Sequence, residues 1–115
     1  MKSRLDSVSN WPQLAKASQY QASALAARCN VSLRQLERYI KHVFHKSPEA
    51  WLNSLRLQEA PQLLSQGLTT KEASFSLGFK HPSHFCALFK RHNGRTPREY
   101  AAEQAKFRQD VAQMQ

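Results

Sequence analysis

The chain has 115 residues, which is enough for one domain or for two small subdomains with a shared core. Its formal net charge of +9 favours a polyanionic partner, either nucleic acid or an anionic membrane surface. No apolar run is long enough to cross a bilayer, the N-terminus lacks a signal-peptide core, and three glycines with few β-branched residues argue against sheets. We therefore expect a helical cytoplasmic protein whose two cysteines, Cys29 and Cys86, stay reduced.

The first part of the chain predicts three short helices. The first ten residues are expected to be loosely ordered, and a helix begins near Trp11 because the proline that follows is tolerated in a first turn. A second helix is predicted over about 22–28, followed by a turn at Asn30, a residue type that accepts left-handed backbone. Ser32 then opens a helix that runs to about residue 44, and Gln35 completes a capping box with it.

A long helix is predicted in the middle of the chain. Ser47 and Pro48 supply its N-cap and first helical residue, and Gly67 ends it. Its apolar residues are Trp51, Leu52, Leu55, Leu63 and Leu64. Thr69 caps the helix that follows, and Glu72 is its reciprocal partner three residues on.

The last part of the chain repeats this order of turn, helix and capping box. Gly78 stands in a second turn, and a helix follows over about 82–92 until Gly94 stops it. Thr96 and Glu99 form a third capping box at the start of a final helix. The stretch 101–115 is either a continuation of that helix or a frayed tail.

Two segments of the chain carry the same pattern of apolar, basic and helix-start positions. Residues 32–51 and 81–100 align at a constant offset, since Pro48 and Pro97 stand 49 residues apart. The matching pairs are Leu36 with Phe85, Ile40 with Phe89, Lys41 with Lys90, and Trp51 with Tyr100. A repeat of this kind indicates two copies of one small structural unit.

The expected fold is therefore all-α, with about seven helices in two helix-turn-helix subdomains joined by a linker helix. The expected boundaries are an N-terminal segment and first helix at 1–18, a first unit at 19–47, a linker helix at 48–67, a second unit at 68–101, and a C-terminal helix or tail at 102–115. Trp51 and Tyr100 are expected to anchor the core behind each unit's second helix.

The helix predicted over 32–44 has one apolar side and one basic side. On a helical wheel, the apolar sector holds Leu36, Tyr39, Ile40 and Val43, and the opposite side holds Arg34, Arg38 and Lys41, flanked by Gln35 and Glu37. The second helix of a helix-turn-helix pair enters the DNA major groove, where the planar fork of arginine can bind guanine O6 and N7 together. The basic side therefore predicts a DNA-reading surface.

The helix over 82–92 has the same geometry with fewer charges at its N-terminal end. Its apolar side holds Phe85, Leu88 and Phe89, and the opposite side holds Ser83, Ala87 and Lys90, flanked by His84, Cys86 and Arg91. Lys90, Arg91, His92 and Arg95 gather at the far end, where they suit phosphates. We expect the first unit to supply more base readout and the second unit more backbone contact.

Several motifs of the chain have the spacing found in one bacterial protein family. The motifs are Ser47-Pro48 with Trp51, Arg56-Leu57 with Ala60, and the run GFKHPSHFCALFKRHNGRTPREY at residues 78–100. Over roughly residues 19–101 the chain resembles the C-terminal DNA-binding domain of AraC/XylS-type transcription regulators. The resemblance implies two recognition helices in successive major grooves about 34 Å apart.

The resemblance also implies which side chains meet DNA. Family contact positions fall on Arg34, Glu37, Arg38, Ser83, His84 and Ala87, with Ser32 and Gln35 near passing phosphates. With the basic residues of both helices added, the predicted DNA-binding set is Ser32, Arg34, Gln35, Glu37, Arg38, Lys41, Ser83, His84, Ala87, Lys90 and Arg91. Duplex DNA is the implied partner, RNA polymerase is a candidate second partner, and no small-molecule ligand site is evident.

The chain departs from the family pattern at four places. Ala73-Ser74 replaces a usual Ile-Ala pair and predicts a thin core in the second unit. His45 replaces a usual glycine, and Ala87 often carries a longer polar side chain in relatives. Pro61 lies inside the linker helix, where it removes a backbone hydrogen bond, so a bend or break is expected near residues 57–61.

Other kinds of chemistry have weaker support in the sequence. The pairs His42/His45 and His81/His84 have helical metal spacing, but a structural zinc site needs four ligands, so no metal, cofactor or enzymatic activity is expected. Cys29 is expected to be a small buried turn residue. The rival function is a basic helical module that binds RNA or membranes without sequence preference. Relatives often carry an N-terminal β-rich effector domain, so the chain is either a small regulator or the reading part of a longer one.

Overall fold

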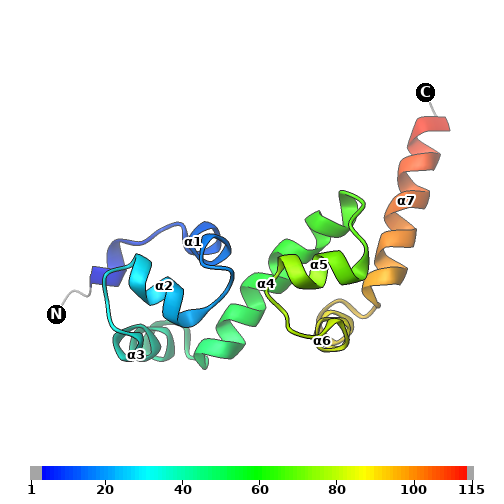
Figure 1. Cartoon of the computed structure of the whole chain (residues 1–115). Coiled ribbons are helices and arrows are strands. Elements are labelled where there is room, and N and C mark those ends of the chain that lie inside the picture. Colours follow the sequence, from blue (N-terminus) through cyan, green and yellow to red (C-terminus); the bar gives the residue numbers. More distant parts are fainter. Residues whose placement is uncertain (1–3, 114–115) are drawn as a thin grey trace. The chain divides into compact units, whose positions relative to one another are not determined.

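The computed structural model describes residues 4–113, with side chains up to residue 109 (Figure 1). Within that range the chain forms one short 3-10 helix and seven α-helices, and no strand. They are η1 (Arg4–Ser7), α1 (Trp11–Ala17), α2 (Ala22–Arg28), α3 (Leu33–Phe44), α4 (Pro48–Ser65), α5 (Thr70–Ser76), α6 (Pro82–Asn93) and α7 (Pro97–Gln113). The all-α class is confirmed. The chain divides into two compact units, Met1–Arg56 and Leu57–Gln115, and the division falls inside α4.

The helices of the first unit begin and end at the residues that the sequence marks for this. The Ser32 hydroxyl accepts a hydrogen bond from the Gln35 N–H at 3.1 Å, and the Ser32 N–H donates to the Gln35 side chain at 2.8 Å. Helix α3 ends at His45, whose backbone is left-handed with φ 57°. The Ser47 hydroxyl then accepts a hydrogen bond from the first turn of α4 at 3.2 Å.

The core of the first unit lies under α3 and the first half of α4. Leu36 and Ile40 of α3 are fully buried. Trp51 is buried as expected, with its ring stacked on Phe44 at 5.2 Å between centroids. Val43, which the helical wheel placed in the apolar sector, is 41% exposed, so the expectation that it is buried is wrong. Its position shows that the apolar sector of the wheel is wider than the buried side of α3, which holds Leu36 and Ile40.

A buried arginine ties α4 to the turn between α1 and α2. The Arg56 guanidinium donates to the Tyr20 carbonyl at 2.7 Å and to the Asn53 side chain at 2.6 Å, and it lies over the Tyr20 ring at 5.7 Å. Burial lowers the pKa of this guanidinium, which stays charged. Gln19 and Tyr20 are both left-handed, with φ 54° and 58°. Arg56 therefore satisfies a carbonyl in a backbone conformation that non-glycine residues seldom adopt.

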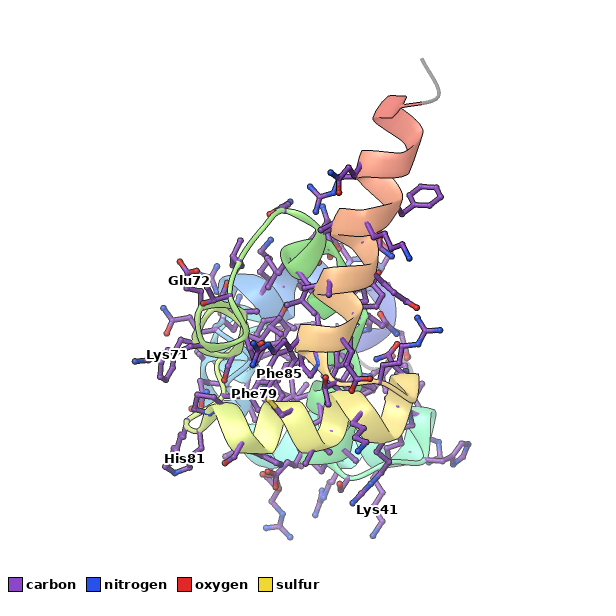
Figure 2. The ribbon with its side chains drawn as sticks, turned by 90° about the vertical axis from the view of Figure 1, so that its right-hand side faces the viewer. Lys41, Lys71, Glu72, Phe79, His81 and Phe85 are labelled. Atoms are coloured by element: carbon purple, nitrogen blue, oxygen red, sulfur yellow. The ribbon has the colours of Figure 1, made fainter. Side chains whose placement is uncertain are left out.

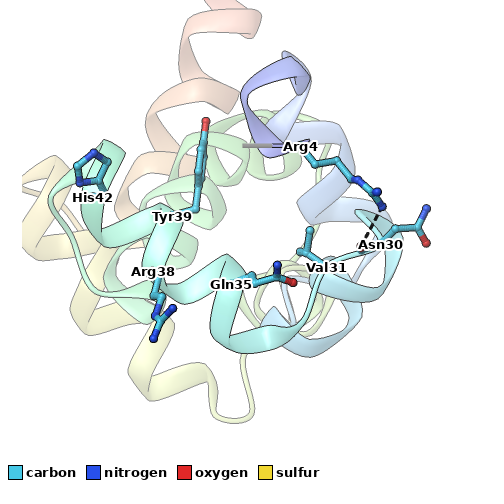
Figure 3. A pocket seen from close by; sticks show the side chains of 7 residues that line it. All are labelled: Arg4, Asn30, Val31, Gln35, Arg38, Tyr39 and His42. Carbon is cyan, nitrogen blue, oxygen red and sulfur yellow. Dashed lines mark hydrogen bonds between the residues drawn. The ribbon is translucent and has the colours of Figure 1, made fainter. Parts of the chain in front are cut away.

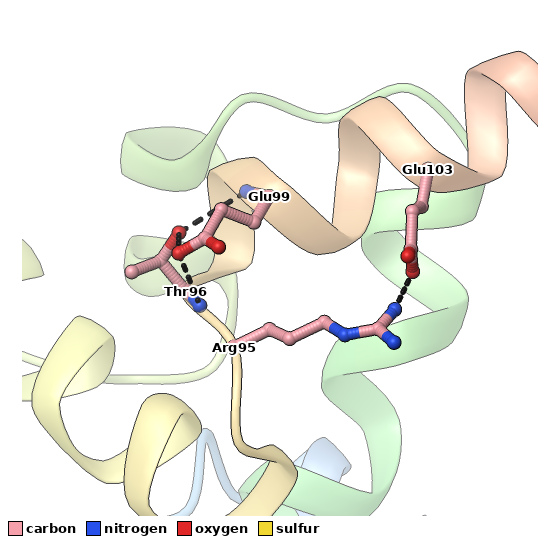
Figure 4. A network of polar contacts seen from close by, with 4 residues as sticks. All are labelled: Arg95, Thr96, Glu99 and Glu103. Carbon is pink, nitrogen blue, oxygen red and sulfur yellow. Dashed lines mark hydrogen bonds and ion pairs between the residues drawn. The ribbon is translucent and has the colours of Figure 1, made fainter.

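The second unit uses the same capping chemistry. The Thr69 hydroxyl accepts from the Glu72 N–H at 3.1 Å, and the Thr69 N–H donates to the Glu72 carboxylate at 3.0 Å. Thr96 and Glu99 repeat this box at the start of α7, where Arg95 also forms an ion pair with Glu103 (Figure 4). Hydrogen bonds from the threonines lower the pKa of both capping carboxyls. All three predicted capping boxes are confirmed.

Aromatic rings form the core of the second unit. Phe85 and Phe89 of α6 are fully buried, with ring centroids 5.8 Å apart. Phe79, from the turn before α6, is also buried, and its ring centroid lies 5.3 Å from that of Phe85 (both labelled in Figure 2). Tyr100 is half-buried and packs edge-on against Phe89 at 5.7 Å. The expected anchor behind α6 is thus present, less deeply buried than Trp51.

Equivalent turns connect the paired helices in the two units. Asn30 has φ 56° and Gly78 has φ 80°, so both residues are left-handed as the sequence predicted. The N–H one residue beyond each turn residue returns to the preceding helix, from Val31 to Ala26 O at 3.1 Å and from Phe79 to Ser74 O at 3.0 Å. These turns set the angle at which each second helix leaves the first.

Helix α4 continues through Pro61, so the predicted break near residues 57–61 is wrong. Proline removes its own hydrogen bond to the carbonyl of Leu57 and its ring crowds that carbonyl, and the packing of neighbouring residues compensates for these costs. Those neighbours are buried: Leu57, Ala60, Leu63 and Leu64. The milder alternative, a bend, stays a prediction.

The two ends of the described chain are more regular than expected. Residues 4–7 form η1 and Leu5 is 1% exposed, so the prediction that the first ten residues are loosely ordered is wrong for this segment. Leu5 is the only large apolar residue before Val8 that the structure describes, and its burial supplies the ordering free energy. At the other end, α7 extends to Gln113, which decides between helix and tail; residues 1–3, 114 and 115 lie outside the described residues.

No helix between residues 4 and 113 combines the length and the apolar composition required to cross a bilayer.

Replacing Ser74 with alanine is expected to stabilise the second unit. Ser74 is fully buried in α5, and its hydroxyl oxygen is without a hydrogen-bond partner among the described residues. A buried unsatisfied hydroxyl costs about 1–3 kcal/mol, so Ser74→Ala should raise the free energy of unfolding by about that amount. Chemical denaturation followed by circular dichroism measures this, with Ser76→Ala, an exposed site in the same helix, as the control. A loss of stability would show that the hydroxyl has a partner.

Candidate nucleic-acid interface

Helix α3 presents a continuous polar surface opposite its buried side. Leu36 and Ile40 are buried on the side where α2 packs. All six residues predicted to contact DNA from this helix and its cap are exposed, namely Ser32, Arg34, Gln35, Glu37, Arg38 and Lys41. The spacing of Arg34, Arg38 and Lys41 places their cations on successive turns of one side. Figure 2 shows Lys41 extended away from the ribbon.

The two cap residues of α3 have a structural task besides any contact with DNA. Their hydrogen bonds hold the first turn of the helix, because each accepts from the backbone N–H of the other. The Ser32 hydroxyl and the Gln35 amide keep their own hydrogens for donation, since both groups act only as acceptors in the cap. The cap thus leaves hydrogen-bond donors on two exposed side chains at the N-terminal end of α3.

Helix α6 also exposes every residue that was predicted to contact DNA. Ser83, His84, Ala87, Lys90 and Arg91 are all exposed. The His84 ring packs edge-on against Phe79, with centroids 5.5 Å apart and an interplanar angle of 87°. This contact gives the imidazole a defined position at the surface, which a flexible exposed side chain would lack.

The charge on α6 is concentrated at its C-terminal end. Its last turn carries Lys90, Arg91 and His92, and its first turn has no acidic residue and no Lys or Arg. Cations at a helix C-terminus are favoured by the helix dipole. On α3 the arginines lie in the first two turns instead. The two helices therefore offer different chemistry at their N-terminal ends: guanidinium forks on α3, and a hydroxyl, an imidazole and a methyl group on α6.

Sequence reasoning missed Arg4, which lies beside the first unit's turn. A surface groove runs along one side of α3, and Figure 3 shows it lined by Arg4, Asn30, Val31, Gln35, Arg38, Tyr39 and His42. Arg4 Nη1 donates to the Asn30 carbonyl at 3.3 Å. The signal that could have found this contact is Leu5, an isolated apolar residue in a polar segment, because its burial holds the neighbouring arginine against the unit.

A second concave surface lies where α3 meets α4. It is lined by Lys41, His45, Lys46, Ser47 and Pro48. Three of these side chains are basic, and the left-handed His45 gives the chain the sharp reversal that places Lys46 between the two helices. Basic side chains beside the first turn of an 18-residue helix suit an anion such as a backbone phosphate.

The histidines and cysteines of the described chain do not assemble into a metal site. No three His, Cys, Asp or Glu side chains between residues 4 and 109 lie close enough to hold an ion together. Cys29 is half-buried rather than fully buried, and burial raises the pKa of its thiol, which disfavours the nucleophilic thiolate. Cys86 is also half-buried, on α6. The exposed sides of α3 and α6 instead carry cations and hydrogen-bond donors, which suit an anionic polymer.

Comparison with known proteins identifies the same domain. A family model described as a helix-turn-helix domain matches residues 25–103. The transcriptional activator RhaS of Escherichia fergusonii is 36% identical over 97 residues, which cover 84% of this chain and 35% of that protein. The chain thus matches about a third of the length of this curated relative.

Two solved structures are similar in both sequence and fold. An AraC-type regulator from Chromobacterium violaceum is 32% identical with a TM-score of 0.67, over 81% of this chain and 87% of that one. The DNA-binding domain of the global transcriptional factor AdpA, solved with a target DNA, is 27% identical with a TM-score of 0.72, over 93% of this chain and 97% of that one. Both of these proteins are named as transcription regulators. This chain therefore belongs to the AraC/XylS-type family of helix-turn-helix DNA-binding domains of transcription regulators, as the matched family model and the similar solved structures show.

Proposed function

We propose that this chain reads a bipartite site in duplex DNA, with α3 and α6 in successive major grooves. On α3 the base edges are contacted by Arg34, Glu37 and Arg38, and on α6 by Ser83, His84 and Ala87. The observation that carries the proposal is the exposed basic side of α3 over a fully buried Leu36 and Ile40, since a helix held in this way can insert only its polar side.

The remaining predicted residues act on the backbone in this proposal. Ser32 and Gln35 meet phosphates at the start of α3, while Lys41, Lys90 and Arg91 bind phosphates further along each helix. Phosphate contacts fix the register of a protein on DNA, and base contacts supply its sequence preference. The neutral first turn of α6 supports a smaller share of base readout for the second unit.

The proposal assigns the chain's parts and its setting. The first reader occupies 19–47, the linker helix 48–67 and the second reader 68–101, flanked by the segments 1–18 and 102–115. The protein acts in the bacterial cytoplasm, where its DNA is. RhaS is named as a transcriptional activator, and activation operates through RNA polymerase, so we include the polymerase as a second partner.

Selection of bound duplexes from a random pool tests the proposal. We expect enrichment of a site with two conserved halves whose centres lie about one helical turn, roughly 10 base pairs, apart. A single enriched half would mean that the second unit grips only the backbone. Equal binding to all duplexes and to RNA would contradict the proposal and favour a non-specific basic module.

A further inference from the structure

The segment before α1 is folded onto the first unit at the side of the recognition helix. Leu5 is 1% exposed, and the Ser7 hydroxyl donates to the Arg4 carbonyl at 3.0 Å, which closes the η1 turn. The Val8 N–H returns to the Leu5 carbonyl at 3.1 Å. Tyr39 of α3 is linked to the same segment, since burial and then a hydrogen bond to Asp6 raise the pKa of its hydroxyl. The segment is thus a built part of this unit.

This packing places one guanidinium beside the turn that precedes α3. Arg4 Nη1 donates to the carbonyl of Asn30, two residues before the N-cap Ser32 (Figure 3). A guanidinium has five N–H donors, so this bond leaves most of the fork for another acceptor. Arg4 is exposed, and so is the carbonyl it binds.

The groove between Arg4 and α3 has the charge that an anion requires. Arg4 lines the groove from η1, and Gln35 and Arg38 line it from α3. None of the residues that line the groove is acidic. An arginine fork forms two parallel hydrogen bonds with a phosphate, which makes arginine the preferred residue for such a contact.

The docking geometry of a helix-turn-helix unit brings a phosphate to this place. The recognition helix enters the major groove by its N-terminal end, so the phosphates that border the groove pass beside that end and the turn before it. We propose that Arg4 binds a DNA backbone phosphate beside the first recognition helix, a contact that lies outside the family-matched residues 25–103. This inference rests on the proposed function, because it needs α3 to be in the groove.

Salt-dependent binding tests the contact. The 115-residue chain and its variants are titrated with the selected duplex between about 50 and 200 mM salt. Arg4→Gln is expected to weaken binding by about threefold to tenfold, to lower the slope of log affinity against log salt by about one, and to leave the base preference unchanged. Arg4→Lys should recover most of the slope, because it restores the charge.

Lys16→Gln is the matched control. Lys16 is exposed on α1 in the same unit and does not line the groove, and the variant removes the same charge. An unchanged slope in Arg4→Gln would overturn the inference while wild-type selection still supports the proposed function. The inference would also fail if Lys16→Gln lowered the slope equally, or if Arg4→Gln and Arg4→Lys lost binding together with thermal stability, since the role would then be bulk charge or folding. Failure of the wild-type chain to select any site would instead remove the proposed function itself.

Discussion

Replacing Phe85 with alanine should destabilise the second unit by about 3–5 kcal/mol. Phe85 is fully buried, with its ring 5.3 Å from Phe79 and 5.8 Å from Phe89. Its loss removes the apolar contacts of a large side chain and leaves a cavity in the core. Small domains are stable by about 5–15 kcal/mol in total, so much of the stability of this unit would be lost.

Equilibrium denaturation of the chain, followed by helical circular dichroism, measures this effect. Phe75→Ala is the matched control, because Phe75 is 52% exposed on α5 and its removal should cost well under about 1 kcal/mol. Equal effects for the two variants would contradict an aromatic core built on α6. Because Phe85 lies in the unit Leu57–Gln115, the transition of the residues before Arg56 should shift less than that of the second unit.

Replacing Arg38 with alanine should reduce affinity for the selected DNA by about 1–3 kcal/mol, or roughly five- to 150-fold. Arg38 is exposed in the second turn of α3, where a guanidinium can bind both acceptors of a guanine. The variant should also tolerate any base pair at one position of the site, because the discriminating contact is gone. Titration against the selected duplex and its single-base variants measures both effects.

Lys41→Ala separates base reading from bulk charge. Lys41 is exposed one turn further along the same side of α3 and carries the same charge. Its loss should weaken binding to every duplex alike and lower the salt slope by about one unit. If Arg38→Ala behaved in the same uniform way, α3 would be a charged surface and not a reader of sequence.

The helix ends were predictable because their causes are local. Ser32 with Gln35, Thr69 with Glu72, and Thr96 with Glu99 are each three residues apart, and each pair closes its capping box by itself. The exposure of the DNA-binding candidates followed from the helical period, since Leu36 and Ile40 mark the buried side of α3. These features need no knowledge of distant parts of the chain.

The features that the sequence did not predict depend on contacts between distant segments. Leu5 is buried and Arg4 reaches Asn30, 26 residues away; the isolated Leu5 hints that the segment is anchored, but no local pattern shows where it packs. Val43 falls in the apolar sector of its wheel yet is 41% exposed, because the helical period fixes the side of a helix and not the neighbour that covers it. The break expected at Pro61 does not occur, because tertiary packing along α4 outweighs the cost of one lost hydrogen bond.

The two copies of the repeated unit place different residue types at their left-handed backbone positions, and this affects which substitutions each copy can accept. The left-handed positions that correspond between the copies are Asn30 and His45 in the first, Gly78 and Gly94 in the second. A side chain in this conformation carries a penalty of about 1–2 kcal/mol, which the first copy already bears and the second avoids. A Cβ at Gly94 would meet no atom within 4 Å, so only the dihedral angle opposes one there. The first copy therefore has less stability left to lose to further destabilising substitutions. The second copy can still accept a non-glycine residue at Gly94, at the cost of the left-handed backbone alone.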